Sequence, residues 1–254
     1  MGPPGNRRAP VHAVVDLGTA ELRPDPARQH GWTVLVDGVA QSYVDLADPE
    51  HLEFPYAKEL GRVVRSRRRH SVLHLGGGGL TMPRLIAHLW PAARQRVVER
   101  DAGLVTLVER FLPIPSSITV EVGEAGRSVD RATGYDLIIL DVFEGAAMPA
   151  SVSSAGFAAK LRGALVPDGL LVVNLTDVPP LAHTRVQAAT IRSAFADVAL
   201  LGPAAVLRGR RAGNIILLAG NVPMIKIGKD ERIIDGTGLA DFIGGARPRL
   251  DEPG

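Results

Sequence analysis

The chain has 254 residues, 46% of them hydrophobic, and a formal net charge of only +2. This length suits one large domain, or one domain with a small appendage, and the apolar fraction can fill a sizeable core. The absence of cysteine excludes a disulfide framework and a thiolate metal site. No run approaches the roughly 20 apolar residues of a membrane span, and the first residues lack a secretory apolar region. We therefore expect a cytoplasmic protein with no membrane partner.

The first 50 residues predict a tail and a small β unit. Residues 1–10 are rich in Pro, Gly and Arg, a composition typical of disorder. Residues 11–50 contain short β-like runs, and Asp37-Gly38 is a turn signal between two of them. These runs predict an N-terminal antiparallel β unit.

A helix is predicted next by the spacing of Leu52, Tyr56, Leu60 and Val63. The basic run that follows, "RVVRSRRRH" at residues 62–70, could be a nucleic-acid patch. It lacks neighbouring aromatic residues for base stacking, so a solvated helix end is the better interpretation. We expect no nucleic-acid partner.

From residue 71, apolar strands alternate with helical segments up to about residue 220. Strands of this kind with helices between them indicate a doubly wound, mostly parallel sheet. The pattern predicts seven strands, of which the last two, "VALLG" and "NIILLAG", have no helix between them. These two should form an antiparallel pair at one edge. Residues 221–254 are polar and Gly-rich and are predicted to form a C-terminal tail.

Four consecutive glycines, Gly76–Gly79, follow the first strand of this region. Ligands bind such sheets at the carboxyl ends of the strands, where glycines allow a close backbone approach and leave N–H groups free. A tight turn without a ligand would explain one glycine far better than four. A dinucleotide fingerprint requires a third glycine that is missing here. Glu99 lies about 20 positions further on, where a carboxylate binds a ribose diol in enzymes using either NAD or S-adenosylmethionine.

The ends of the other strands favour S-adenosylmethionine. Glu124 follows the third strand and could accept a hydrogen bond from an adenine amino group, and Asp141 ends the fourth strand. A plain strand-end cap is the alternative role for Asp141. His74 is expected to be a core histidine, and Asp177 could either line the acceptor side or have no role there.

These motifs together resemble the polyamine aminopropyltransferases, the spermidine synthase family, over about residues 30–220. The segment "LVDGVAQ" is similar to the N-terminal "LDG-x-x-Q" hairpin of that family, and "LEFPY" to its "DEFxY" segment. The runs "HLGGGG", "VVERD" and "VGEAG" are similar to its "IGGGDG", "LVEID" and "xxGDG/A" motifs. A hairpin and a glycine turn of these types are a specific combination.

The resemblance implies a class I S-adenosylmethionine-dependent methyltransferase fold, decarboxylated S-adenosylmethionine or S-adenosylmethionine as co-substrate, a small amine acceptor, no metal, and a homodimer. It also implies a set of co-substrate-binding residues: Gln41, Tyr56, Gly76, Gly77, Gly78, Glu99, Glu124 and Ala125.

Several positions depart from the family pattern. Gly79 stands where the family has Asp, and Ala57-Lys58 replaces His-Glu after Tyr56. The acceptor-side Tyr-Pro-Ser-Gly segment is replaced by a run that contains Arg210 and Arg211. Because a cation repels a cationic acceptor, we expect these arginines to weaken the acceptor half of the resemblance.

The expected chemistry is an attack by an amine on the carbon beside a sulfonium. An acceptor amine is protonated at neutral pH, so the site needs carboxylates to hold it and remove its proton. Asp141 and Glu144 are the predicted catalytic pair. Two alternatives stay open: a methyltransferase with the same donor pocket, and a non-catalytic protein that binds the nucleoside.

Overall fold

The N-terminal sheet has four antiparallel strands in the order β1-β2-β3-β4. We describe it from a computed structural model that covers residues 8–143 and 148–251. The turn between the third and fourth strands is made by Asp37 and Gly38, which both have positive φ, at 48° and 77°. This is the backbone that the Asp-Gly signal predicts. The strands are β1 (Val11–Val15), β2 (Gly18–Pro24), β3 (Gly31–Val36) and β4 (Val39–Asp45).

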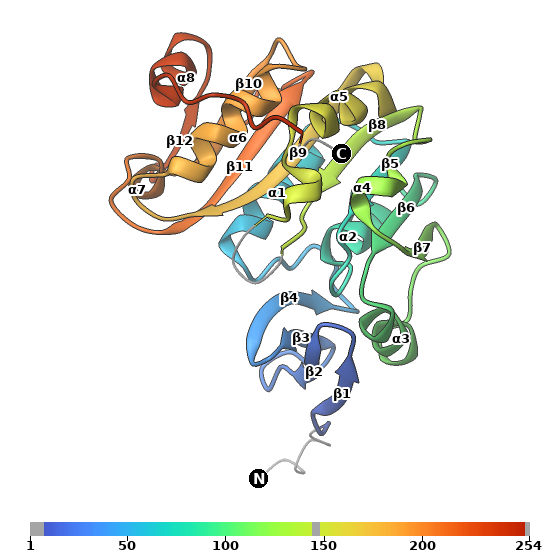
Figure 1. The fold of residues 1–254 in the computed structure, drawn as a ribbon. Coiled ribbons are helices and arrows are strands. Elements are labelled where there is room, and N and C mark those ends of the chain that lie inside the picture. Colours follow the sequence, from blue (N-terminus) through green and yellow to red (C-terminus); the bar gives the residue numbers. More distant parts are fainter. Residues whose placement is uncertain (1–7, 144–147, 252–254) are drawn as a thin grey trace.

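The main sheet has eight strands in the described chain, in the order β12-β10-β11-β9-β8-β5-β6-β7 (Figure 1). The five from β9 to β7 are parallel, and β11, β10 and β12 add antiparallel strands. The strands are β5 (Ser71–Leu75), β6 (Arg94–Glu99), β7 (Ile118–Val122), β8 (Tyr135–Leu140), β9 (Leu165–Asp177), β10 (Val198–Pro203), β11 (Gly213–Gly220) and β12 (Glu231–Ile234). The helices are α1 (Pro55–Arg65), α2 (Thr81–Leu89), α3 (Ala102–Phe111), α4 (Ala125–Ser128), the short 3-10 helix Ala150–Val152, α5 (Ala155–Ala164), α6 (Ala182–Arg192), α7 (Ala204–Leu207) and α8 (Gly236–Ile243).

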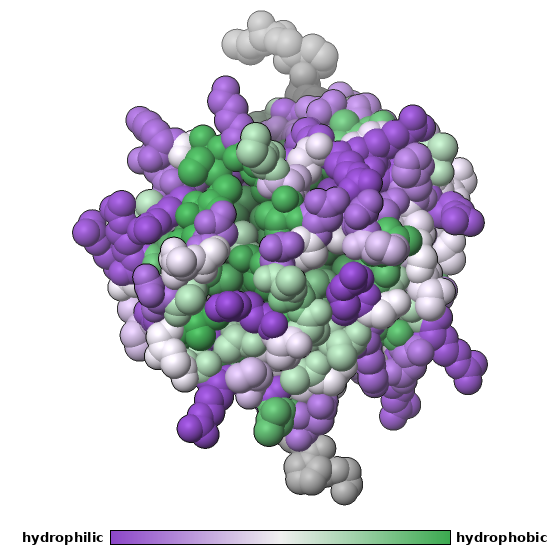
Figure 2. Space-filling view, turned by 90° about the horizontal axis from the view of Figure 1, so that it is seen from above, coloured by the Kyte–Doolittle hydropathy of each residue, from purple (hydrophilic) through white to green (hydrophobic). Residues whose placement is uncertain are grey.

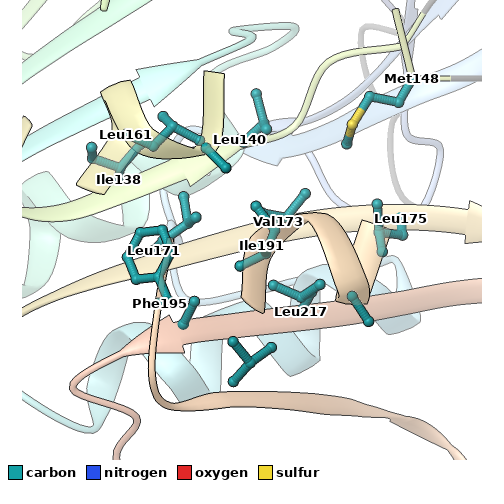
Figure 3. Close-up of a cluster of buried hydrophobic side chains, with 14 of the residues drawn as sticks. Ile138, Leu140, Met148, Leu161, Leu171, Val173, Leu175, Ile191, Phe195 and Leu217 are labelled. Carbon is teal, nitrogen blue, oxygen red and sulfur yellow. The ribbon is translucent and has the colours of Figure 1, made fainter. Parts of the chain in front are cut away.

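Alternate residues of the central strands face two separate cores. Ile138, Leu171 and Leu217 pack under α5 and α6, in the cluster drawn in Figure 3. Their neighbours Ile139 and Val172 pack on the opposite face against α1 and α2. Burial on both faces explains the continuous apolar runs of these strands, and it confirms the predicted α/β, Rossmann-like class.

A third core joins the N-terminal sheet to the main domain, and Figure 1 shows this sheet below α2 and beside α3. Leu22 and Val34 of the small sheet pack in one cluster with Leu104 and Leu107 of α3. Four strands alone bury little area, so this contact supplies the missing half of a core.

The C-terminal region differs from the prediction. Residues 221–254 were expected to be a polar tail, but β12 pairs with β10 and α8 contributes Leu239 and Phe242 to the first core. The β10–β11 pair therefore forms as predicted but does not lie at the edge, and the sheet has eight strands instead of seven. A one-turn helix, α7, also lies between β10 and β11. The sequence pattern that would predict β12 is weak because this strand has only four residues.

In the described ranges, no helix has the length and apolar character needed to cross a bilayer. Seen from above, hydrophilic side chains project around the rim of the molecule, and hydrophobic residues gather nearer its centre (Figure 2).

Candidate functional site

The glycine turn after β5 fits between the ends of β6 and β8. The Gly76 N–H donates to the Val98 carbonyl, and the Asp141 N–H donates to the Leu75 carbonyl. Gly76 has a φ of +94°, and a Cβ there would lie 2.1 Å from the carbonyl oxygen of Asp141. The backbone of β8 therefore leaves no room for a side chain at this position.

Glu99 at the end of β6 organises the next two glycines. Its Oε2 accepts hydrogen bonds from Gly77 N, at 2.8 Å, and Gly78 N, at 3.2 Å. Its Oε1 accepts from Asp101 N at 3.1 Å. The carboxylate is therefore fixed beside the turn by three backbone N–H groups.

The fourth glycine contacts the N-terminal sheet. Gly79 N donates to the Ser42 hydroxyl of β4 at 2.8 Å. A Cβ at Gly79 would lie 2.6 Å from that oxygen and 2.9 Å from Val34. The close approach of β4 gives a physical reason for glycine where the spermidine synthase pattern has aspartate.

A cavity of about 880 Å³ opens over the carboxyl ends of β5, β6, β7 and β8. Its volume is in the range of small-molecule sites. Nine of the predicted site residues line it: Gln41, Tyr56, Gly76, Gly77, Gly78, Glu99, Glu124, Ala125 and Asp141. The tenth, Glu144, lies outside the described residues. Gln41 comes from β4 and Tyr56 from α1, so the N-terminal sheet and the first helix of the main domain both contribute to the cavity wall.

Asp141 is the acidic group whose electrostatics stand out in this cavity. Its removal from water raises its pKa to about 6, a hydrogen bond from Asn174 opposes the rise, and the charge of Glu99 adds to it. The Tyr56 hydroxyl donates to the Gln41 carbonyl at 3.3 Å. Burial and the charge of Asp141 raise the pKa of Tyr56, which keeps this hydroxyl protonated.

Asn174 and Asn214 also line the cavity, although the sequence did not identify them as site residues. Asn174 Nδ2 donates to Asp141 Oδ1 at 2.9 Å, and Asn214 Nδ2 donates to Asn174 Oδ1 at 3.1 Å. The available signal was an amide inside the apolar run "LLVVNL". Asn174 is only 1% exposed, and a buried amide needs partners.

Two other polar candidates have structural roles. Asp177 Oδ2 accepts from both the N–H and the hydroxyl of Thr184, each at 2.8 Å, so it caps α6; it is not among the cavity residues. The expected alternative of a contact on the acceptor side is therefore not supported. His74 Nε2 lies 2.9 Å from Gln95 Oε1, and burial lowers its pKa to about 4, so it is the buried neutral histidine that was expected, although it also lines the cavity.

The chain is similar to curated polyamine aminopropyltransferases over part of its length. The chain is 30% identical over 159 residues to a polyamine aminopropyltransferase of Vibrio vulnificus, covering 59% of this chain and 52% of that protein. It is 31% identical over 108 residues to a probable polyamine aminopropyl transferase of Bifidobacterium longum, covering 42% of this chain and 24% of the relative. The chain thus matches about half, or less, of the length of these curated relatives. No family model matches it.

Among solved structures, a probable spermidine synthase from Corynebacterium glutamicum superposes with a TM-score of 0.90 and 28% identity, over 97% of this chain and 98% of that one. The chain is therefore similar in fold and in part of its sequence to this probable spermidine synthase. A spermidine synthase from Thermotoga maritima, with a TM-score of 0.62 and 18% identity, covers 87% of this chain and 74% of its own, and shares the fold. Human methyltransferase-like protein 13 also shares the fold, with a TM-score of 0.55 and 16% identity over 76% of this chain and 90% of that one.

The arginines that depart from the spermidine synthase pattern lie outside the described cavity wall. Arg210 and Arg211 are exposed, and neither is among the described residues that line the cavity. The charge of Arg211 instead acts on Glu59, where it opposes the rise in pKa that burial causes. The expected repulsion of a cationic acceptor is therefore absent from the described cavity wall.

No group of three or more His, Asp or Glu side chains in the described residues is arranged to hold a metal ion.

Proposed function

We propose that this spermidine synthase-like chain transfers an aminopropyl group from decarboxylated S-adenosylmethionine to a small amine. One observation carries the proposal: a single cavity is lined by the glycine turn, Glu99, Asp141 and Tyr56. The curated relatives bear the name of this activity, and one solved relative is a spermidine synthase in complex with the transition-state analogue AdoDATO.

The nucleoside half of the co-substrate would lie over β5, β6 and β7. Glu99 already accepts backbone hydrogen bonds, and its remaining lone pairs would accept from the ribose hydroxyls. Glu124 and Ala125 would contact the base, and Gln41 would cover the nucleoside from β4. The sulfonium would then point toward Asp141.

At the other end, Asp141 would hold the attacking amine. Asp141 would first accept one proton from the protonated amine, which frees the nitrogen lone pair. The lone pair then forms a bond to the carbon beside the sulfur, the carbon–sulfur bond breaks, and its electrons neutralise the sulfonium. A pKa of about 6 leaves this carboxylate mostly ionised at neutral pH while keeping it a better proton acceptor than an ordinary aspartate. Glu144 would share this role.

Mass spectrometry of products tests the proposal. The purified chain is incubated with a panel of diamines and monoamines, and with either decarboxylated or intact S-adenosylmethionine. We expect acceptors to gain the mass of one aminopropyl group. A gain of one methyl group would instead identify a methyltransferase. Nucleoside binding without any product would identify a binding protein.

We also propose a homodimer in the cytoplasm, as expected from the family. Light scattering that reports a monomer at micromolar concentration would contradict the dimer.

A further inference from the structure

Four polar side chains form a line across three neighbouring strands beside the cavity. Leu140 of β8 pairs with Val173 of β9, so Asp141 lies next to Asn174. Asn214 of β11 pairs with Thr176 of β9. Residues two apart in a strand share a face, so the register brings these side chains to one side of the sheet. That side is covered by α1, which carries Tyr56.

The hydrogen bonds along this line have a defined direction. Asn214 Nδ2 donates to Thr176 Oγ1 and to Asn174 Oδ1, both at 3.1 Å. The Asn174 amide is thereby held with its oxygen toward β11 and its nitrogen toward β8. Its Nδ2 then donates to Asp141 Oδ1 at 2.9 Å. If the Asn174 amide were flipped, its oxygen would face the Asp141 carboxylate. Its nitrogen would face the Nδ2 donor of Asn214, and both hydrogen bonds would be lost.

We propose that Asn174 and Asn214 are positioning residues that fix the orientation of the Asp141 carboxylate through this chain of amides. Asn214 acts at one remove, because its only role toward Asp141 is to set the direction of the Asn174 amide. The purpose of this orientation rests on the proposed function: it would present Oδ2 of Asp141 to the acceptor amine. The hydrogen-bond chain itself is independent of that function.

The effect of the amide chain on Asp141 can be measured through the pKa of this carboxyl, which depends on its surroundings. The other titratable groups that line the cavity are Tyr56 from α1, His74 from β5, Glu99, Arg100 and Asp101 from the β6–α3 segment, Asp37 from the N-terminal sheet, and Glu124. Desolvation and Glu99 raise the pKa of Asp141, and the Asn174 amide opposes them. Loss of the amide should therefore raise this pKa further, since a donor to the charged form is removed.

The experiment is a pH titration of the Asp141 carboxyl carbon by NMR, in the full chain with labelled aspartate, assigned by its loss in Asp141→Asn. Wild type should titrate near 6. Asn174→Ala should raise the value by about one unit. Asn214→Leu fills the space without a donor and excludes water, so it should also raise the value, by less. Thr176→Val should have the smallest effect. Thr81→Val is the control, because Thr81 lines the same cavity but donates to the Tyr43 carbonyl.

An unchanged Asp141 pKa in Asn214→Leu, with a shift in Asn174→Ala, would overturn the role of Asn214. No shift in either variant would overturn the whole chain. If the shifts occur and wild type transfers no group to any amine, the proposed function fails and the amide chain stands. If transfer occurs, the acidic limb of the kcat/KM profile should move with the NMR value in each variant, which a purely structural role would not produce.

Discussion

At the scale of single residues, Glu99 joins an observed contact, with the glycine turn, to a proposed one, with the nucleoside. It holds the N–H groups of Gly77 and Gly78, and it stands where ribose hydroxyls would bind. A turn preorganised by the same carboxylate that contacts the ligand reduces the ordering needed on binding. Replacement of Glu99 should therefore affect both the turn and the nucleoside.

We expect Glu99→Ala to weaken binding of 5′-methylthioadenosine by about ten- to a hundredfold, because charge-assisted hydrogen bonds contribute roughly 1.5–3 kcal/mol. Isothermal calorimetry measures the change. Glu121→Ala is the matched control, since Glu121 on the next strand is paired with Arg96 outside the cavity. Equal affinity in wild type and Glu99→Ala would remove Glu99 from the site.

Asp141→Asn should separate catalysis from stability. Turnover should fall by at least about a hundredfold, as expected for a general base, with nucleoside affinity nearly intact. The raised pKa means that the native state binds the Asp141 proton more tightly than the unfolded chain does, so stability is lost as pH rises from the usual 3.8 to about 6. At pH 7 the asparagine variant should therefore melt about 2–4 °C higher.

A carboxyl on the same strand provides the contrast. Asp136 Oδ2 accepts from His70 N and Ser71 N, so Asp136→Asn removes charged hydrogen bonds and should lower the melting temperature. Full turnover in Asp141→Asn, with any acceptor found, would contradict the catalytic assignment.

At the scale of elements, the β1–β2 turn is clasped to the start of α3. The Asp101 carboxylate accepts from Leu104 N inside its own helix and from Asp16 N and Leu17 N of the turn. Asp16 in return accepts from Ala102 N at 2.8 Å. This reciprocal capping brings Val15 so close to α3 that a Cβ at Gly103 would lie 2.8 Å from Val15 Cα.

Gly103→Ala should therefore loosen the N-terminal sheet although alanine favours helix. Hydrogen exchange should show faster exchange for amides of β1 and β2 and unchanged exchange in β8 and β9. Gly163→Ala in α5 is the matched control, because a Cβ there meets nothing within 4 Å. It should stabilise the chain by up to about 1 kcal/mol. Stabilisation by both substitutions would show that the clasp tolerates a wider spacing.

At the scale of the whole molecule, a buried acidic group lies beside the ion pair that joins the first helix of the main domain to its last strand. Glu59 of α1 is 3% exposed, and its Oε2 has no hydrogen-bond partner among the described residues. Arg62, one turn further along α1, pairs with Glu231 of β12 at 2.5 Å. Burial, and then the charge of Glu231, raises the pKa of Glu59 to about 7, against the opposing charges of Arg62 and Arg211.

The free energy of unfolding should depend on pH through Glu59. The native state holds the Glu59 proton that the unfolded chain releases near 4.5, so the free energy of unfolding should fall as pH rises from there to about 7. Glu59→Gln should remove this decline and be more stable than wild type at pH 8. Urea unfolding at pH 5 and pH 8 measures it. A parallel loss of stability with pH in both proteins would assign the effect to other groups.

Much of this architecture could be predicted from local patterns. The apolar strands and the glycine turn are contiguous in sequence, so the fold class, the glycines, Glu99, Glu124 and Asp141 followed from the pattern. Gln41, Tyr56 and Ala125 were implied only by the family resemblance. β12 and α8 could not be predicted, because their burial exists only once β10 offers an edge. Asn174 and Asn214 meet across strands 40 residues apart, and Glu59 resembles an ordinary helical surface residue until Glu231 is placed beside it.

The shared core between the N-terminal sheet and α3 also sets an order of events during synthesis. Leu22 and Val34 are completed by side chains as late as Leu112 and Ile118. The first strands to leave the ribosome therefore have no finished apolar partner until about seventy further residues have followed, counted from Asp45 to Ile118. During this period the apolar face of the nascent β1–β4 sheet is exposed, and a growing chain with exposed apolar surface is prone to aggregation or chaperone binding.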